Sequence, residues 1–163
     1  MAKGNAIVLS SPFGRKVEGT VFGSGVLPGM IMQIKAGESE DGTGRLTYEV
    51  ATPGGDGQRP LGPLYVADLD FLTGGTQDTP YIDGSRITML CPHHGDELNV
   101  RVSAAGTGTG DGYAVGQPFI IDNGTGNLIA TTGTPDAEPF MAIEDIDDVV
   151  AGGTLVACVY AGG

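Results

Sequence analysis

The sequence predicts an all-β protein, a compact β-barrel or sandwich-like domain with long glycine-rich loops. The 163 residues include 29 glycines and 10 prolines, both above average usage, which provides for many turns. Hydrophobic residues make up 40% and charged residues only 17%, a balance too apolar for a disordered chain. Several short runs alternate between apolar and polar residues, which is the period of a half-buried strand. We therefore expect at most one or two short helices.

Ten short segments have the composition of strands and end at turn residues. The alternation is clearest in the sixth of them, where Leu98, Val100 and Val102 would share one face. The second is apolar at consecutive positions, which is typical of a strand buried on both faces. The predicted strands lie at residues 17–22, 30–36, 45–51, 63–68, 86–91, 97–103, 117–121, 127–131, 139–144 and 153–160.

A helical pattern occurs in residues 144–151. Ile146, Val149 and Val150 stand at positions i, i+3 and i+4. Acidic residues lie near the start of this segment, where a helix dipole favours them, and a Gly-Gly pair follows it. We expect one short helix or turn here, leading into the last strand.

The length suits one domain. We divide the sequence into an extended N-terminal arm, residues 1–17, and a single β-rich domain, residues 18–163. Residues 37–112 contain long glycine-rich loops or an insertion. Loops of this length in a compact domain often carry function, and in an assembly protein they order against a partner.

The formal net charge is −12 at pH 7, and the acids are spread along the chain. Such a surface repels phosphates, so we expect no direct binding to nucleic acid. The acidity either keeps the protein soluble or attracts a basic partner, and both interpretations remain open. Residues 1–35 have the opposite balance, which fits a segment lying on an acidic neighbour or a frayed terminus with chance charges. Their charged residues are Lys3, Arg15, Lys16, Glu18 and Lys35.

The two cysteines, Cys91 and Cys158, lie in apolar runs far apart in the sequence. Cysteine in such a run behaves as a small hydrophobic residue, so we expect two buried, reduced thiols. No apolar run approaches the length that spans a membrane, and we expect no membrane partner. The apolar run near Met1 is short for a signal peptide, which points to synthesis in a reducing cytoplasm.

The segment Cys91–Glu97 is the strongest candidate for a metal site, because it contains both histidines. Neighbouring residues of a strand point to opposite faces, so His93 and His94 would meet at one ion only within a turn. Pro92 and Gly95 permit such a turn, but no third histidine exists to complete the site. We expect a polar loop here, with no metal and no cofactor.

No pattern indicates an enzyme, and we assign no catalytic residues. The chain lacks a Gly-x-Ser-x-Gly elbow, and residues 106–112 lack the Gly-Lys-Ser/Thr ending of a phosphate loop. Asp68 and Asp70 begin like a calcium loop that Leu72 interrupts. A weak ion site using Asp68, Asp70 or Asp78 therefore remains an alternative to a solvated loop.

The C-terminal part carries a recognisable order of elements. Residues 113–130 read as strand, Asn-Gly turn, strand; an Ala-x-Glu-Asp step follows at 142–145, then a final strand with a short glycine-containing tail. This order resembles the small β-rich head decoration (cement) proteins of tailed bacteriophages. The resemblance covers residues 113–163 and, more weakly, 25–36, whereas 37–112 resemble no family.

The resemblance implies a non-enzymatic virion protein, assembled in the host cytoplasm and placed on the capsid surface. Such proteins bind the outside of the mature capsid, commonly as homotrimers, and clamp neighbouring subunits of the major capsid protein. An N-terminal arm would attach them by adding a strand to a neighbouring sheet. Here the arm would use the apolar Ile7, Val8 and Leu9 with the basic Arg15 and Lys16.

Two other classes stay open. One is another virion β-protein, such as a head-fibre or tail component. The other is a sugar- or ion-binding β module, although the chain has no tryptophan and few aromatic residues for a sugar platform.

Overall fold

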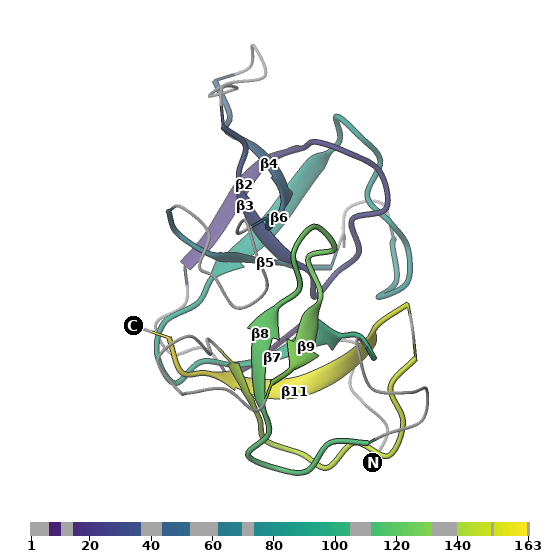
Figure 1. Ribbon diagram of the computed structural model, residues 1–163. Coiled ribbons are helices and arrows are strands. Elements are labelled where there is room, and N and C mark those ends of the chain that lie inside the picture. Colours follow the sequence, from purple (N-terminus) through teal and green to yellow (C-terminus); the bar gives the residue numbers. More distant parts are fainter. Residues whose placement is uncertain are drawn as a thin grey trace.

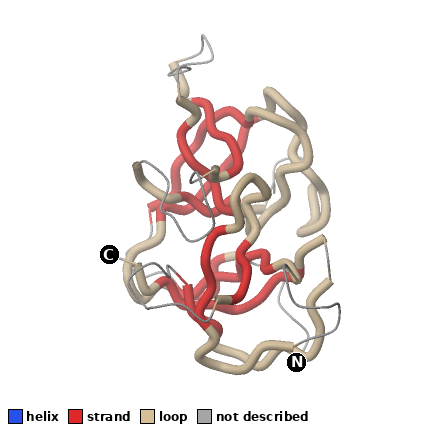
Figure 2. The backbone as a smooth tube through the Cα atoms, viewed as in Figure 1, coloured by secondary structure: helices blue, strands red, loops and turns tan. Residues whose placement is uncertain are grey.

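The computed structural model describes residues 7–10, 15–36, 44–52, 62–69, 74–104, 112–131, 140–150 and 152–162. Within these ranges the protein consists of strands and loops without a helix, as Figure 2 shows, so the prediction of an all-β fold is confirmed. In the same ranges no helical segment is long and apolar enough to cross a membrane.

Each of the ten predicted segments overlaps one observed strand, β2 beginning two residues before its segment, and a further strand precedes them. The strands are β1 (Val8–Ser10), β2 (Arg15–Val21), β3 (Ile31–Ile34), β4 (Thr47–Val50), β5 (Tyr65–Ala67), β6 (Arg86–Cys91), β7 (Glu97–Val102), β8 (Pro118–Ile121), β9 (Leu128–Ala130), β10 (Phe140–Ala142) and β11 (Thr154–Tyr160).

The first barrel closes in the order β2-β4-β3-β5-β6. Its β2–β4 pair is parallel and its other pairs are antiparallel. Large apolar side chains fill its interior, among them Met32 and Met89. The Tyr48 and Tyr65 rings meet there edge to face, with centroids 5.1 Å apart.

The second barrel is built from β7 to β11, in the order β7-β11-β10-β8-β9. It closes where Val102 of β7 pairs with Leu128 of β9. The short strand β1 occupies the other end of the same β7 edge, opposite Leu98 and Glu97. Strands β1 and β9 therefore share one edge of β7.

The two barrels share a core. Ile31, Val66 and Leu90 form a row across β3, β5 and β6, and all three are buried. They belong to the same apolar cluster as the second-barrel interior residues Leu98 and Phe140. The barrels accordingly lie one against the other (Figure 1), and the outer face of the first contributes to the core of the second.

The β8–β9 hairpin also joins the barrels. Its Asn123-Gly124 turn places Gly124 at φ 91°, a conformation that glycine adopts readily. The Ile31 N–H donates to the Gly126 carbonyl oxygen at 2.6 Å, which connects the hairpin to β3. Figure 1 shows this hairpin reaching from the second barrel toward the first.

The helix that the sequence pattern favoured over 144–151 does not form within the described part, 144–150. Ile146 instead makes an isolated bridge with Tyr113, and each backbone N–H donates to the other's carbonyl oxygen. Val149 is buried while Val150 is exposed, so the two do not share a covered helical face. Distant backbone partners outweigh a weak local preference here.

The described parts of the predicted N-terminal arm, residues 1–17, belong to the folded domain. Ile7 is 1% exposed and belongs to the shared core cluster. Its carbonyl oxygen accepts a hydrogen bond from the Asn99 N–H at 2.7 Å, next to the β1–β7 pairing. Residues 15–17 begin β2 of the first barrel. The segment therefore contributes to both barrels, and residues 1–6 and 11–14 lie outside the described ranges.

Burial in the first barrel raises the pKa of Tyr48 to about 12, with a smaller contribution from the neighbouring Tyr65. A folded-state pKa above the unfolded value favours the folded protein while the phenol is protonated, so this stabilisation is complete below about pH 10 and lost toward pH 12. Alkaline titration followed by phenolate absorbance should show ionisation of Tyr48 only together with unfolding. The Tyr48→Phe variant should lose less stability as the pH rises from 10 to 12. If all five tyrosines of the folded protein ionised reversibly near pH 10, the raised pKa of Tyr48 would be contradicted.

Candidate attachment surface

Large apolar side chains exposed to solvent are the natural candidates for contacts with another protein. Among the described residues, three belong to the first barrel and four to the second. The first-barrel group is Phe22, Leu46 and Ile82, and the second-barrel group is Val115, Met141, Ile143 and Val150.

The second-barrel group is centred on the outer face of β10. Side chains alternate along a strand, and Phe140 and Ala142 point into the core while Met141 is 40% exposed. Residues paired directly across strands point to the same side, so Pro118 of β8 and Val159 of β11 lie beside Met141. Three adjacent strands thus present apolar side chains outward at one level.

The loop before β8 and the residue after β10 extend this surface. The Gly116 N–H donates to the Ala142 carbonyl oxygen at 2.9 Å, and the Val115 N–H donates to Asp145 Oδ1 at 2.9 Å. These bonds place Val115, which is 60% exposed, next to the segment 142–145, in which Ile143 is 37% exposed. We call the surface formed by Val115, Pro118, Met141, Ile143 and Val159 the β10 face.

Acidic residues border the β10 face. Glu97 is exposed and pairs with Val159 across β7 and β11, and the exposed Asp145 accepts the Val115 bond. The sequence contains no lysine or arginine after Arg101, and Arg101 itself is 3% exposed. The two charged residues identified at the border of this face are therefore both acidic.

The first-barrel group is different in charge and arrangement. The Lys35 ammonium lies over the Phe22 ring, 2.9 Å from its centroid, and so covers part of it. Ile82 stands in a turn in which the Ser85 N–H donates to the Ile82 carbonyl oxygen. Arg86 and Glu18 form an exposed ion pair nearby on β6 and β2. These side chains are exposed singly and among charges of both signs.

The residues that the sequence pattern suggested for attachment are not brought together as one arm. Lys16 forms an ion pair with the buried Asp68, with 2.6 Å between Nζ and Oδ2. Arg15 is exposed at the start of β2, opposite Cys91. Val8 and Leu9 lie in β1, and the attachment role of all five residues stays a prediction.

The Cys91–Glu97 segment is a turn between β6 and β7, with His93 and His94 both exposed. Asp96 is fully buried, and its Oδ2 accepts a hydrogen bond from the His93 N–H at 2.8 Å. Burial raises the pKa of the half-buried Cys91 thiol, which keeps it protonated, and Cys158 is buried in the core. The described residues contain no group of three or more metal-ligating side chains.

Two of the three candidate ion ligands form ion pairs with protein cations. Asp68 pairs with Lys16 and also accepts the Leu69 N–H at 2.9 Å. Asp78 pairs with Arg101, with 2.8 Å between Nη2 and Oδ1. Asp70 lies outside the described residues.

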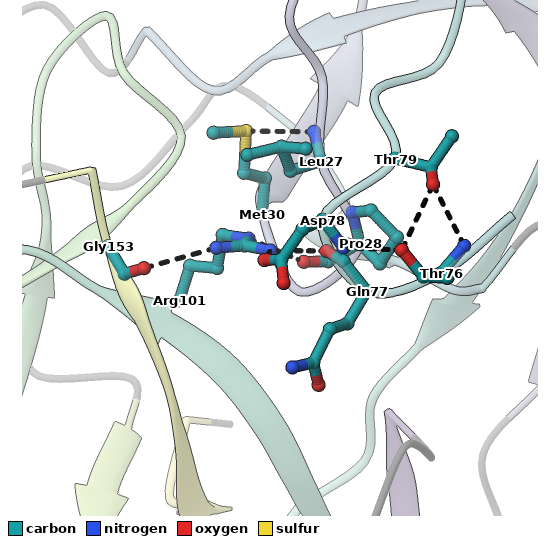
Figure 3. A network of polar contacts seen from close by, with 9 residues as sticks. All are labelled: Leu27, Pro28, Met30, Thr76, Gln77, Asp78, Thr79, Arg101 and Gly153. Atoms are coloured by element: carbon teal, nitrogen blue, oxygen red, sulfur yellow. Dashed lines mark hydrogen bonds and ion pairs between the residues drawn. The ribbon is translucent and has the colours of Figure 1, made fainter.

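Arg101 lies at the centre of a network of polar contacts (Figure 3). Its Nε donates to the Pro28 carbonyl oxygen at 2.9 Å, and its Nη1 donates to that of Gly153 at 3.1 Å. Its Nη2 donates to the Gln77 carbonyl oxygen and pairs with Asp78. The guanidinium therefore braces two first-barrel loops against the second barrel, a structural role that the sequence analysis missed.

The sequence pattern did not lead us to the β10 face, although the apolar run at 140–143 pointed to it. Consecutive apolar residues at 140–143 indicate a strand that is apolar on both faces. An antiparallel strand with one solvated face normally carries polar residues on that face.

No family model matches the chain, and no curated protein matches it in sequence. Among solved structures, it is similar to the crystal structure of the head fiber gp8.5 N base in bacteriophage phi29, with a TM-score of 0.54. The match has 12% sequence identity and covers 91% of this chain and 95% of that chain. At this identity the likeness shows a shared fold.

Proposed function

We propose that this protein is a structural component of a phage virion that binds the outside of the mature capsid lattice. The observation that carries the proposal is the likeness to the phi29 head fiber base, which extends over 91% of this chain. The order of elements in residues 113–163, which resembles head decoration proteins, supports the same class.

The mechanism we propose is stabilisation by mass action. A protein that binds only the expanded lattice stabilises that lattice, by about 2.7 kcal/mol per site when its free concentration is 100 times the dissociation constant. Clamping neighbouring major capsid subunits would oppose their separation. As the resemblance implies, we expect three copies to associate at each position.

The base of a head fibre is a second candidate, because the matched structure is itself a fibre base and is covered over 95% of its length. Such a base would bind the capsid in order to carry a further domain, and it need not stabilise the lattice. The two candidates therefore differ in their effect on capsid stability.

The test uses capsids of the same phage that lack this protein, before and after expansion. Purified protein should co-sediment saturably with expanded capsids and not with unexpanded ones, and cryo-electron microscopy should show it as trimers on the outer surface. It should also raise the temperature at which capsids rupture. Binding without stabilisation would favour the fibre base, and no binding would contradict both; a thermal-shift screen with sugars and divalent ions would then test a binding module.

A further inference from the structure

The outer surface of the second barrel is apolar over a larger area than the β10 face alone, and part of it is already covered within the chain. Leu155 points outward from β11 and is only 6% exposed, because the first barrel packs on it. A Cβ atom added at Gly29 would lie 2.5 Å from Leu155 Cδ2, which shows how close this packing is. Two residues further along β11, Ala157 faces the same way, followed by Val159.

The β10 face continues this covered surface and has no cover among the described residues. Met141, Ile143 and Val115 remain 40%, 37% and 60% exposed. The outer apolar surface of the second barrel is therefore covered by the first barrel at Leu155 and exposed to solvent at the β10 face. This continuity suggests that a second protein surface completes the cover.

Charge indicates what that second surface is like. Glu97 and Asp145 lie at the border of the face, and both are exposed carboxylates. A second copy docking by the same face would bring like charges together, and a nucleic acid would be repelled. A protein surface with an apolar centre and a border of lysine or arginine matches both features.

We propose that the β10 face is the surface that docks on the capsid, against a site with an apolar centre and a basic border. This rests on the proposed function, since it names the contact through which capsid binding would occur. Apolar contact supplies most of the affinity, while Glu97 and Asp145 orient the approach and raise the association rate.

The test compares two polar substitutions in the face with one on the other barrel. Met141→Thr with Ile143→Thr should raise the dissociation constant for expanded capsids by about tenfold or more. Ile82→Thr, which changes a 77% exposed isoleucine, should leave it within about twofold. All variants should keep the melting temperature within a few degrees, because the altered side chains are exposed; if the double variant unfolds, the single substitutions replace it.

A second measurement tests the charge of the partner. Capsid binding should weaken as salt rises, and Glu97→Lys should bind more weakly than Glu97→Gln, mainly through slower association. Normal binding by the double threonine variant, or loss of binding only in Ile82→Thr, would overturn this inference while leaving the proposed function intact. Dissociation of an oligomer in the double variant would instead identify a second copy as the occupant. Failure of the unaltered protein to bind would overturn both.

Discussion

Arg101→Met should destabilise the folded protein by about 3–5 kcal/mol, because it leaves several buried or half-buried carbonyl oxygens without a hydrogen-bond donor. The side chain is 4% exposed and engages three carbonyl oxygens and one carboxylate. Methionine keeps much of the length but supplies no donor, so the carbonyls of Pro28, Gly153 and Gln77 would lose their partner. The brace between the two barrels would be lost with it.

Urea unfolding followed by far-ultraviolet circular dichroism would measure this loss, and the melting temperature should fall on the order of 10 °C. Arg86→Met is the matched control, since Arg86 is 43% exposed and pairs with the exposed Glu18. An exposed pair of this kind contributes about 0–1 kcal/mol. Similar losses in both variants would show that the Arg101 network does not hold the barrels together.

Ile7→Ala should cost about 2–5 kcal/mol of folding stability, the range for large-to-small substitutions in a core. Ile7 is 1% exposed, and its cluster includes side chains from both barrels. Truncation would leave a cavity where β1 joins β7. If residues 2–12 formed an arm outside the core, their deletion would leave the folding stability unchanged. Because Ile7 is buried in the core, this deletion should instead destabilise the protein.

The same urea titration measures this effect, with Ile82→Ala as the matched control. Ile82 is 77% exposed, so its truncation should change stability by about 0.5 kcal/mol or less. An unchanged midpoint for Ile7→Ala, together with weaker capsid binding, would restore the interpretation of this segment as an attachment arm.

The strands could be predicted because their signals are local. Alternation at 97–103 and the Asn123-Gly124 turn each lie within a few residues, and both elements formed where expected. The strand β1 was assigned to an arm, because a strand of only three residues gives no indication in the sequence of the strand with which it pairs. The same lack of context explains why the helical pattern at 144–151, read as a short helix or turn, forms no helix in its described part: Ile146 finds its backbone partner in Tyr113.

The candidate site was predictable only in part. The positive charge of the N-terminal segment suggested that Lys16 contacts a partner. In the fold, Lys16 instead forms an ion pair with Asp68, which lies 52 positions away in the sequence. Met141 and Ile143 are exposed on the β10 face; the consecutive apolar residues at 140–143 indicate a strand that is apolar on both faces, but they do not tell which face stays uncovered.

The sequence by itself determined the all-β class, the places of ten strands and the turns between them, since glycine, proline and alternation act on the backbone locally. Only the tertiary structure decided that the strands close into two barrels, that Ile7 belongs to their shared core and that the β10 face stays open. The physical reason is that burial is a property of the packed molecule. Ile31, Val66 and Leu90 form one buried row only because three strands, distant in sequence, pair side by side and meet a second barrel.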